Sequence, residues 1–530
     1  MAAKHSAPIR GLSRAGADNT STQKFEGRFG RMFPQVKAAD FGANEAAWTE
    51  HLKPLARAMV SEFDAPKDGP DSEESGIPAL YTYLGQFIDH DITFDPSSSF
   101  QKAKDPNALT DYRSPAFDLD NVYGRGPGDQ PYMYQANGVS FALGDSLQLG
   151  NPPGAHDLYR SVDGRAVIGD PRNDENAIVS QLQGLFHRFH NRLMADAPAT
   201  EDGFNAVRRE VTFHYQYVVL HDFLPRIVSE SVLEQLQTRG RYDEKKLRYF
   251  RPQDSHDPFL PVEFSGAAYR LGHSMVRPGY RLNDATLVPI FPVAPKDRPG
   301  FPEGLTGFRR MISDWGIDWG RFIDVGEPRR YDADPQDKND QANNLSRFKR
   351  LQFAYRLDTS LVDPLGSLPA AVAAHPASLA LRNLIRGAQL GLPSGQDVAR
   401  ALELPVLEDK DILIGQAVDE NPQLQSIAAI GAGRFKGKCP LWTYILAEAA
   451  LHKKMIDVPV AENVGKAGSV RIGTPQLGPV GGRIVAEVFL GLIFADPLSL
   501  LRMQPDWAPP SVQGGKSYQL KDFVQFALGK

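Results

Sequence analysis

Cysteine is almost absent from this chain. Cys439 is the single cysteine among 530 residues, so no disulfide can form within the chain and thiols can supply little chemistry. Long hydrophobic runs are also missing. The longest apolar stretch, residues 484–495, contains Glu487 and is too short to cross a bilayer. We therefore expect no transmembrane segment.

An excess of one charge is missing as well. The net charge is -5, and charged residues make up 23% of the chain, which argues against nucleic acid or an anionic membrane as a partner. Hydrophobic residues reach 42%, enough for a sizeable core. The 47 glycines and 41 prolines indicate a protein rich in loops.

Composition changes clearly only near the N-terminus. Residues 1–45 are polar, glycine-rich and basic, which predicts an extended arm followed by one large domain over residues 46–530. The first residues, MAAKHSAPIRGLSRAG, contain no apolar run typical of a secretory signal. We expect a cytoplasmic protein, with leaderless export left open.

Helical periodicity dominates the rest of the chain. Apolar residues three and four apart predict helices at residues 81–94, 176–195, 204–230, 266–276, 379–389, 442–452 and 482–494. Strand signals are few, and Asp163-Gly164 within residues 158–170 predicts a short hairpin. The sequence predicts a mainly α fold with long loops and a few short β-hairpins.

One predicted helix carries an unusual set of polar residues. In YLGQFIDHDITFDP (residues 83–96), Gln86, Asp89 and His90 share one face, which an ordinary solvated surface would also explain. Asp91 instead falls within the apolar stripe. A buried carboxylate needs a cation or several hydrogen bonds, and a hard cation with oxygen ligands is one candidate.

A second acidic stretch follows in RSPAFDLDNVYG (residues 113–124). It contains Ser114, Asp118 and Asp120. Counted from Asp118, the sixth position is Tyr123 and the twelfth is Asp129, so this is not an EF-hand loop. Alone it is typical of an acidic surface loop, but together with Asp91 it predicts a calcium site.

Four segments follow one another along the chain, in the order GQFIDHDITF, GDPRNDENAIVSQLQGLFHRFHNRL, AYRLGHSMVRPGYRL and LRNLIRGAQLGLPSG. Together these four segments resemble the animal-type haem peroxidases of the peroxidase–cyclooxygenase superfamily, as a bacterial-like member. The resemblance extends over roughly residues 75 to 500. It implies a single-domain haem peroxidase fold with haem b and calcium as cofactors.

The resemblance also implies roles for individual residues. His90 would be the distal base with Gln86 beside it, and Arg172 the distal arginine. His273 would ligate the haem iron, with Asn383 bonded to its other ring nitrogen. The remaining residues would be the propionate-binding arginines Arg270 and Arg386, the carboxylates Asp89 and Glu175, and the calcium ligands Asp91, Ser114, Ala116 (through its carbonyl), Asp118 and Asp120. Whether Asp89 and Glu175 form ester bonds to haem stays open.

These residue types suit the implied chemistry. A neutral imidazole can take a proton from hydrogen peroxide and return it to the leaving oxygen. A guanidinium beside it stabilises the negative charge that develops as the O–O bond breaks. The expected function is oxidation of small donors through a ferryl intermediate. Phenols, iodide and thiocyanate are the expected donors, with bromide left open. Chloride is expected to be a poor donor, because Asn176 stands where the most oxidising mammalian member of the family has methionine.

Three alternatives stay open. In cyclooxygenases the residue three before the proximal histidine is a radical tyrosine; here it is Arg270, with Tyr269 one step away, so a fatty-acid dioxygenase is the first alternative. The second is a haem-binding protein that no longer turns over. The third is a protein without haem. Among the other polar residues of these segments, His187 and His190 are expected to have packing roles, and Arg277 to lie on the surface.

Overall fold

The computed structural model describes most of the chain. The described residues are 27–61, 73–93, 110–111, 115–150, 155–252, 259–292, 304–326, 329–330, 349–370, 372–373, 375–416, 423–460, 468–513 and 515–530. The predicted arm over residues 1–45 lies partly outside them. Residues 27–44 run against the domain and bury Phe29 and Phe33, and a backbone N–H of Phe33 donates to buried Glu263.

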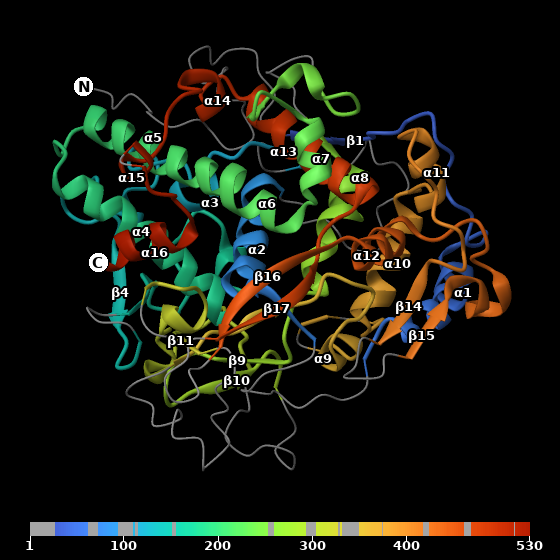
Figure 1. Cartoon of the computed structure of the whole chain (residues 1–530). Helices are drawn as coiled ribbons and strands as arrows, with labels where there is room; N and C mark the ends of the chain where they lie inside the picture. The colour runs from blue at the N-terminus through green and yellow to red at the C-terminus, as the bar shows by residue number, and fades with distance from the viewer. Residues whose placement is uncertain are drawn as a thin grey trace.

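Helices make up most of the regular structure (Figure 1). The α-helices are α1 Glu45–Ala58, α2 Leu80–Ile92, α3 Asp120–Tyr123, α4 Ala177–Ala195, α5 Glu201–Val218, α6 Leu224–Ile227, α7 Glu230–Gln235, α8 Val262–Ser265, α9 Asp363–Gly366, α10 Leu379–Gln389, α11 Gly395–Ala401, α12 Leu441–Leu451, α13 Pro479–Ala495, α14 Leu500–Met503, α15 Pro510–Gln513 and α16 Leu520–Leu528. The 3₁₀ helices η4 Pro171–Asp174 and η7 Ala268–His273, and the π-helical turn η5 Val219–Phe223, also matter below.

Strands are short and mostly paired in twos. They are β1 Gly27–Gly30, β2 Glu74–Pro78, β3 Thr110–Asp111, β4 Leu143–Ser146, β5 His156–Leu158, β6 Gln237–Thr238, β7 Arg241–Tyr242, β8 Phe259–Pro261, β9 Gly279–Arg281, β10 Leu287–Pro289, β11 Arg329–Arg330, β12 Lys349–Arg350, β13 Phe353–Tyr355, β14 Leu413–Gln416, β15 Gln423–Ser426, β16 Lys453–Val460 and β17 Gly468–Pro475. Strands β3, β1 and β8 form a three-stranded sheet. The longest pair is the antiparallel hairpin β16–β17.

Helix α2 lies near the centre of the molecule (Figure 1). It packs against α4 and η4 on one side and against η7 on the other. Its apolar residues Leu84, Phe87 and Ile88 are buried in one large core cluster. Helix α13 is apolar on all sides and almost wholly buried, as expected for a helix at the centre of a large domain. The mainly α fold is confirmed.

Side-chain oxygens accept hydrogen bonds where two of the central helices begin. Asn176 caps α4, because its side-chain oxygen accepts from the backbone N–H groups of Ile178 and Val179. Helix α13 begins at the buried carboxylate of Glu448, which accepts from the N–H groups of Val480 and Gly481. Both devices satisfy donors that would otherwise be buried without partners.

Two predicted helices need correction. Within residues 266–276 the structure has the short 3₁₀ helix η7 (Ala268–His273) instead of an α-helix, with i→i+3 bonds such as Ser274 N–H to the Leu271 carbonyl. Residues 204–230 divide into α5, the π-helical turn η5 and α6, and α6 ends at Ile227. The spacing of apolar residues does not distinguish α-, 3₁₀ and π-helices here. Their repeats differ by less than one residue per turn, which is too little to detect in segments this short.

The surface position expected for Arg277 is wrong. Its side chain is fully buried and pairs with Glu74, which also binds Arg350 at 2.5 Å. Arg277 also donates to the carbonyl of Phe353 in β13 at 2.9 Å, and these partners from distant parts of the chain are not encoded in the local sequence. Separately, no described helix combines the length and apolar character that a membrane span requires.

Candidate functional site

The site begins with His90 on α2. Its Nδ1 lies 2.7 Å from Oδ1 of Asn173, and its Nε2 lies 3.6 Å from a carboxylate oxygen of Glu175. The ring is 4% exposed. Gln86, one turn earlier, donates from Nε2 to the same Glu175 oxygen and accepts from the Asn176 amide at 3.1 Å. The structure therefore brings the predicted residues His90, Gln86 and Glu175 together.

Arg172 lies beside this group, at the C-terminal end of α2. Its guanidinium binds Asp170 and donates to the His90 carbonyl at 3.0 Å and to the Thr93 carbonyl. A cation is favourable there, because the last carbonyls of a helix carry partial negative charge. The neighbouring Asp174 is fixed by the buried side chain of Arg160, through bonds of 2.6 and 2.7 Å. The loop that carries Arg172 is thus anchored on both sides.

Burial raises the pKa of two carboxyl groups in the site. Burial raises the pKa of Glu175 to about 7, although Arg172 opposes this shift. Burial also raises the pKa of Asp89, opposed by Arg172 and Arg270. Asp89 is thus within electrostatic reach of both Arg172 and Arg270.

His273 ends the 3₁₀ helix η7. Its Nδ1 lies 2.8 Å from Nδ2 of Asn383 on α10, so the predicted contact is present. Arg270, however, donates to Oδ1 of Asn383 at 2.6 Å. The amide consequently presents its N–H side to Nδ1 of His273, and a half-turn of the amide would present its oxygen instead. Burial, followed by Arg270, lowers the pKa of His273 to about 3, so the ring is neutral.

The two histidine segments face each other. The Tyr269 hydroxyl of η7 donates to the Gly85 carbonyl of α2 at 3.2 Å. Arg386 and Arg382 on α10 act electrostatically on Arg270, which in turn acts on His273. Burial and then Arg386 lower the pKa of Arg270 to about 10. A neutral imidazole ligand, a second imidazole on the facing helix and arginines suited to propionates form a donor set that fits haem.

A separate acidic cluster lies behind α2. Single carboxylate oxygens of Asp91, Asp118 and Asp120 all lie within 4.8 Å of one another, and all three residues are buried. Burial and the nearby Asp91 raise the pKa of the Tyr215 phenol well above its usual value. Three buried carboxylates repel one another unless a cation or protons neutralise them, so this oxygen set fits a hard cation. Ala116 lies in the same bend, whereas Ser114 lies outside the described residues.

Sequence reasoning missed several polar residues of this site. Asn173 and Asp170 flank Arg172 in the chain, and only this closeness to a predicted site residue marked them in the sequence. Gln183 was detectable, since it is a polar residue on the buried side of a predicted amphipathic helix and is fully buried. The packing role of His190 is confirmed, because its ring nitrogens bond the Tyr123 hydroxyl at 3.0 Å and the Val139 carbonyl at 2.9 Å.

The sequence is similar to known proteins over a large part of its length. The family model described as animal haem peroxidase matches residues 101–293, which include Arg172 and His273. Human thyroid peroxidase is 23% identical over 451 residues, covering 68% of this chain and 42% of the relative. Canine thyroid peroxidase is likewise 23% identical, with 39% of its length covered. The chain thus spans less than half the length of these curated relatives.

Solved structures share the fold. Peroxidase A from Dictyostelium discoideum superposes with a TM-score of 0.57 at 14% identity, covering 98% of this chain and 97% of that chain. A fatty acid alpha-dioxygenase from Arabidopsis thaliana gives a TM-score of 0.51 at 13% identity, covering 98% of this chain and 83% of that chain. At such identities the likeness concerns the fold alone. Residues 101–293, which include Arg172 and His273, are thus similar to the animal haem peroxidase family.

Proposed function

We propose that the protein is a haem peroxidase that uses hydrogen peroxide to oxidise small electron donors. One observation carries this proposal. His90 turns Nδ1 to a hydrogen-bond partner, Asn173, and leaves Nε2 next to Gln86 and Glu175, with the Arg172 guanidinium alongside. An imidazole held in this way can act as a base toward a small acid such as peroxide.

Bound haem would supply the redox-active iron that accepts the oxidising equivalents of peroxide. His273 would hold the iron through Nε2, and Arg270 and Arg386 would hold the propionates. His90 would accept the peroxide proton at Nε2 and deliver it to the leaving oxygen. Arg172 would stabilise the negative charge on that oxygen, since it is already fixed by Asp170. Asp89 and Glu175 would be the carboxyl groups available for ester links to haem.

Phenols, iodide and thiocyanate are the proposed donors. The Asn176 side chain caps α4 and bonds Gln86, and it offers no sulfur for a further link to haem. Fatty-acid dioxygenation is the second candidate, because Tyr269 is a buried phenol between the two histidine segments. The dioxygenase is the weaker candidate. Residues three apart in a 3₁₀ helix lie on the same face, so Arg270 is the residue of η7 that shares a face with His273.

The test is a steady-state assay of haem-loaded protein. We expect peroxide-dependent oxidation of guaiacol, iodide and thiocyanate, and only slow oxidation of chloride at neutral pH. Oxygen uptake with linoleate is measured in parallel. Uptake that Tyr269→Phe abolishes would favour the dioxygenase. Haem-loaded protein that bleaches in peroxide without oxidising any donor would refute the peroxidase proposal.

We further propose calcium at the cluster of Asp91, Asp118 and Asp120. Asp91 adjoins His90 in the chain but lies on the other side of α2, so a cation there would fix the helix that carries the base. Calcium takes six to eight oxygen ligands and accepts such carboxylates. The Ala116 carbonyl and the Ser114 hydroxyl are the proposed additional ligands.

Removing calcium is expected to lower thermal stability. A cation present at 100 times its dissociation constant stabilises the folded state by about 2.7 kcal/mol, so a chelator should lower the melting temperature by roughly 2 to 3 degrees in a domain of this size. Asp118→Asn should weaken or abolish this response. Asp163→Asn, an exposed turn residue, is the matched control and should keep it. Identical melting curves for the parent protein in calcium and in chelator would count against the site.

A further inference from the structure

A buried chain of side chains extends away from His90. Nδ1 of His90 meets Oδ1 of Asn173 at 2.7 Å, and Nδ2 of Asn173 donates to Oε1 of Gln183 at 2.8 Å. Nε2 of Gln183 then meets Nε2 of His187 at 2.9 Å. Exposures are 4% for His90, 0% for Asn173 and Gln183, and 2% for His187. The chain joins α2, η4 and α4.

Every bond in this chain can point in the same direction. His90 donates to Asn173, Asn173 donates to Gln183, and Gln183 donates to His187. Turning both amides would reverse all three bonds, but then Nδ1 of His90 would accept and Nε2 would carry the hydrogen. Only the first direction leaves a lone pair on Nε2. The same direction also needs no turning of the amides when Nε2 takes a proton. Both ring nitrogens of the protonated imidazole are donors, and Nδ1 already donates to Asn173.

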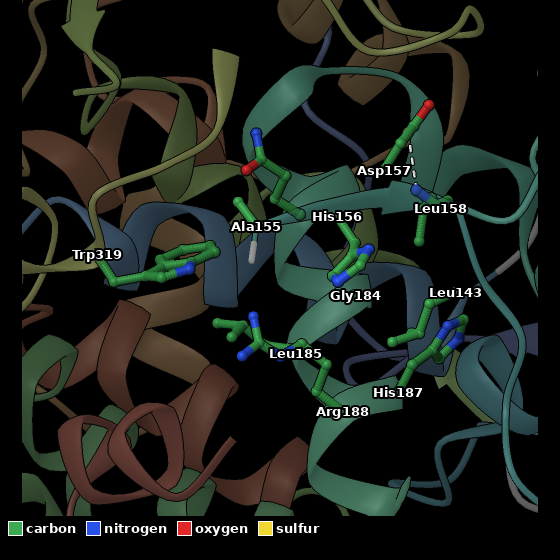
Figure 2. Close-up of a pocket in the computed structure, with 11 residues that line it drawn as sticks. Leu143, Ala155, His156, Asp157, Leu158, Gly184, Leu185, His187, Arg188 and Trp319 are labelled. Carbon is green, nitrogen blue, oxygen red and sulfur yellow. Dashed lines mark hydrogen bonds between the residues drawn. The ribbon is translucent and has the colours of Figure 1, made fainter. Parts of the chain in front are cut away.

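His187 can serve as the accepting end. Burial lowers its pKa to about 3, so the ring is neutral with one accepting nitrogen. Phe141 stacks on it with ring centres 4.2 Å apart. His187 also lines a cavity of about 20 Å³ between β5 and α4, where Trp319 lies at one side (Figure 2). That volume holds one water, which could accept from Nδ1 of His187, an atom without a hydrogen-bond partner among the described protein groups.

We propose that Asn173 is a positioning residue that locks His90 in the tautomer with hydrogen on Nδ1, and that Gln183 and His187 fix the direction of the Asn173 amide. The inference rests on the proposed peroxidase function. The chain holds orientation and carries no proton, because side-chain amides are too weakly acidic and basic to pass one along. Its effect is to keep the base lone pair of His90 in the site at all times.

Two small ligands separate this role from simple packing. Hydrogen cyanide must lose its proton to a nearby base to bind ferric haem, whereas carbon monoxide carries no proton and needs only access to ferrous haem. Asn173→Leu should slow cyanide association roughly 10- to 100-fold, since a positioned base contributes about 10² to 10⁴. The rate of carbon monoxide association should change less than about twofold, because this ligand carries no proton. A change below that limit is taken to mean that the pocket is intact.

A rescue variant and a second position complete the test. Asn173→Asp keeps an acceptor for Nδ1 and should recover most of the cyanide rate. Gln183→Met removes the group that orients Asn173 and should slow cyanide several-fold; if Asn173→Leu does not bind haem, this variant decides. Gln181→Met is the matched control on α4, since Gln181 bonds the Trp315 carbonyl and the Ile317 N–H outside the chain. It should leave the cyanide rate unchanged.

The outcomes separate this inference from the proposed function. If the parent protein binds haem and cyanide normally while the Asn173 and Gln183 variants match it, the positioning role is refuted and the peroxidase proposal stands. A parallel fall in cyanide and carbon monoxide rates refutes it too, since that pattern reports a collapsed pocket. A parent protein that binds no haem refutes the proposed function itself.

Discussion

His273→Ala is expected to remove the Soret band of the haem-loaded protein and to reduce peroxide-dependent donor oxidation to background. The reason is that the side chain supplies the proposed bond from the protein to the iron. Its ring is neutral, with a lowered pKa, and its Nδ1 is fixed by Asn383. Iron without that ligand loses both its anchor and the electron donation that tunes its redox potential. Absorption spectra before and after reconstitution with haem measure the loss.

A matched histidine variant is the control for this result. His221 is exposed in the turn η5, far along the chain from both histidine segments, and His221→Ala should keep the spectrum of the parent protein. Circular dichroism of both variants checks that the fold is intact. A Soret band that persists unchanged in well-folded His273→Ala would mean that another residue binds the iron.

His90→Ala should leave haem bound but slow the reaction with peroxide. Removing a positioned base typically costs roughly 10²- to 10⁴-fold, so kcat/KM for peroxide should fall by that factor. The KM for the electron donor should stay nearly constant, because His90 acts on the peroxide proton. Stopped-flow mixing of the haem-loaded protein with peroxide measures the first step directly.

A second residue of α2 provides the comparison. Tyr83 is buried on the same helix against Tyr280, with ring centres 5.3 Å apart. Tyr83→Phe changes the packing of α2 without touching the residues around His90, so its peroxide rate should equal that of the parent protein. An unchanged rate in His90→Ala would show that another group, such as Glu175 with its pKa of about 7, takes the proton.

Much of the fold could be predicted from periodicity. Helices α2, α4, α10, α12 and α13 lie within a few residues of the predicted ranges, because long amphipathic or apolar segments with clear ends have few other solutions. The buried acid on α2 was also predictable, since Asp91 interrupts an apolar stripe. Helix α1 was not predicted, although Asn44 caps it.

Side-chain partners were less predictable than helices. The proposed roles of His90, Arg172 and His273 came from resemblance to a family, and the sequence offered no distances. Arg277 shows the limit most clearly. A charged residue on a short helical segment is usually exposed, and only the approach of Glu74 from a strand about 200 residues away made its burial possible.

The sequence alone determined the helical framework, the absence of internal disulfides and the placement of polar residues in apolar helices. These follow from local rules, in which each residue is judged against neighbours three or four positions away. The tertiary structure decided which distant side chains meet: His90 with Asn173, Gln183 with His187, and Arg270 with Asn383. Such contacts depend on how helices pack in space. Hydrogen bonds between different elements produce no periodic pattern of residues in the sequence, so the sequence does not reveal them.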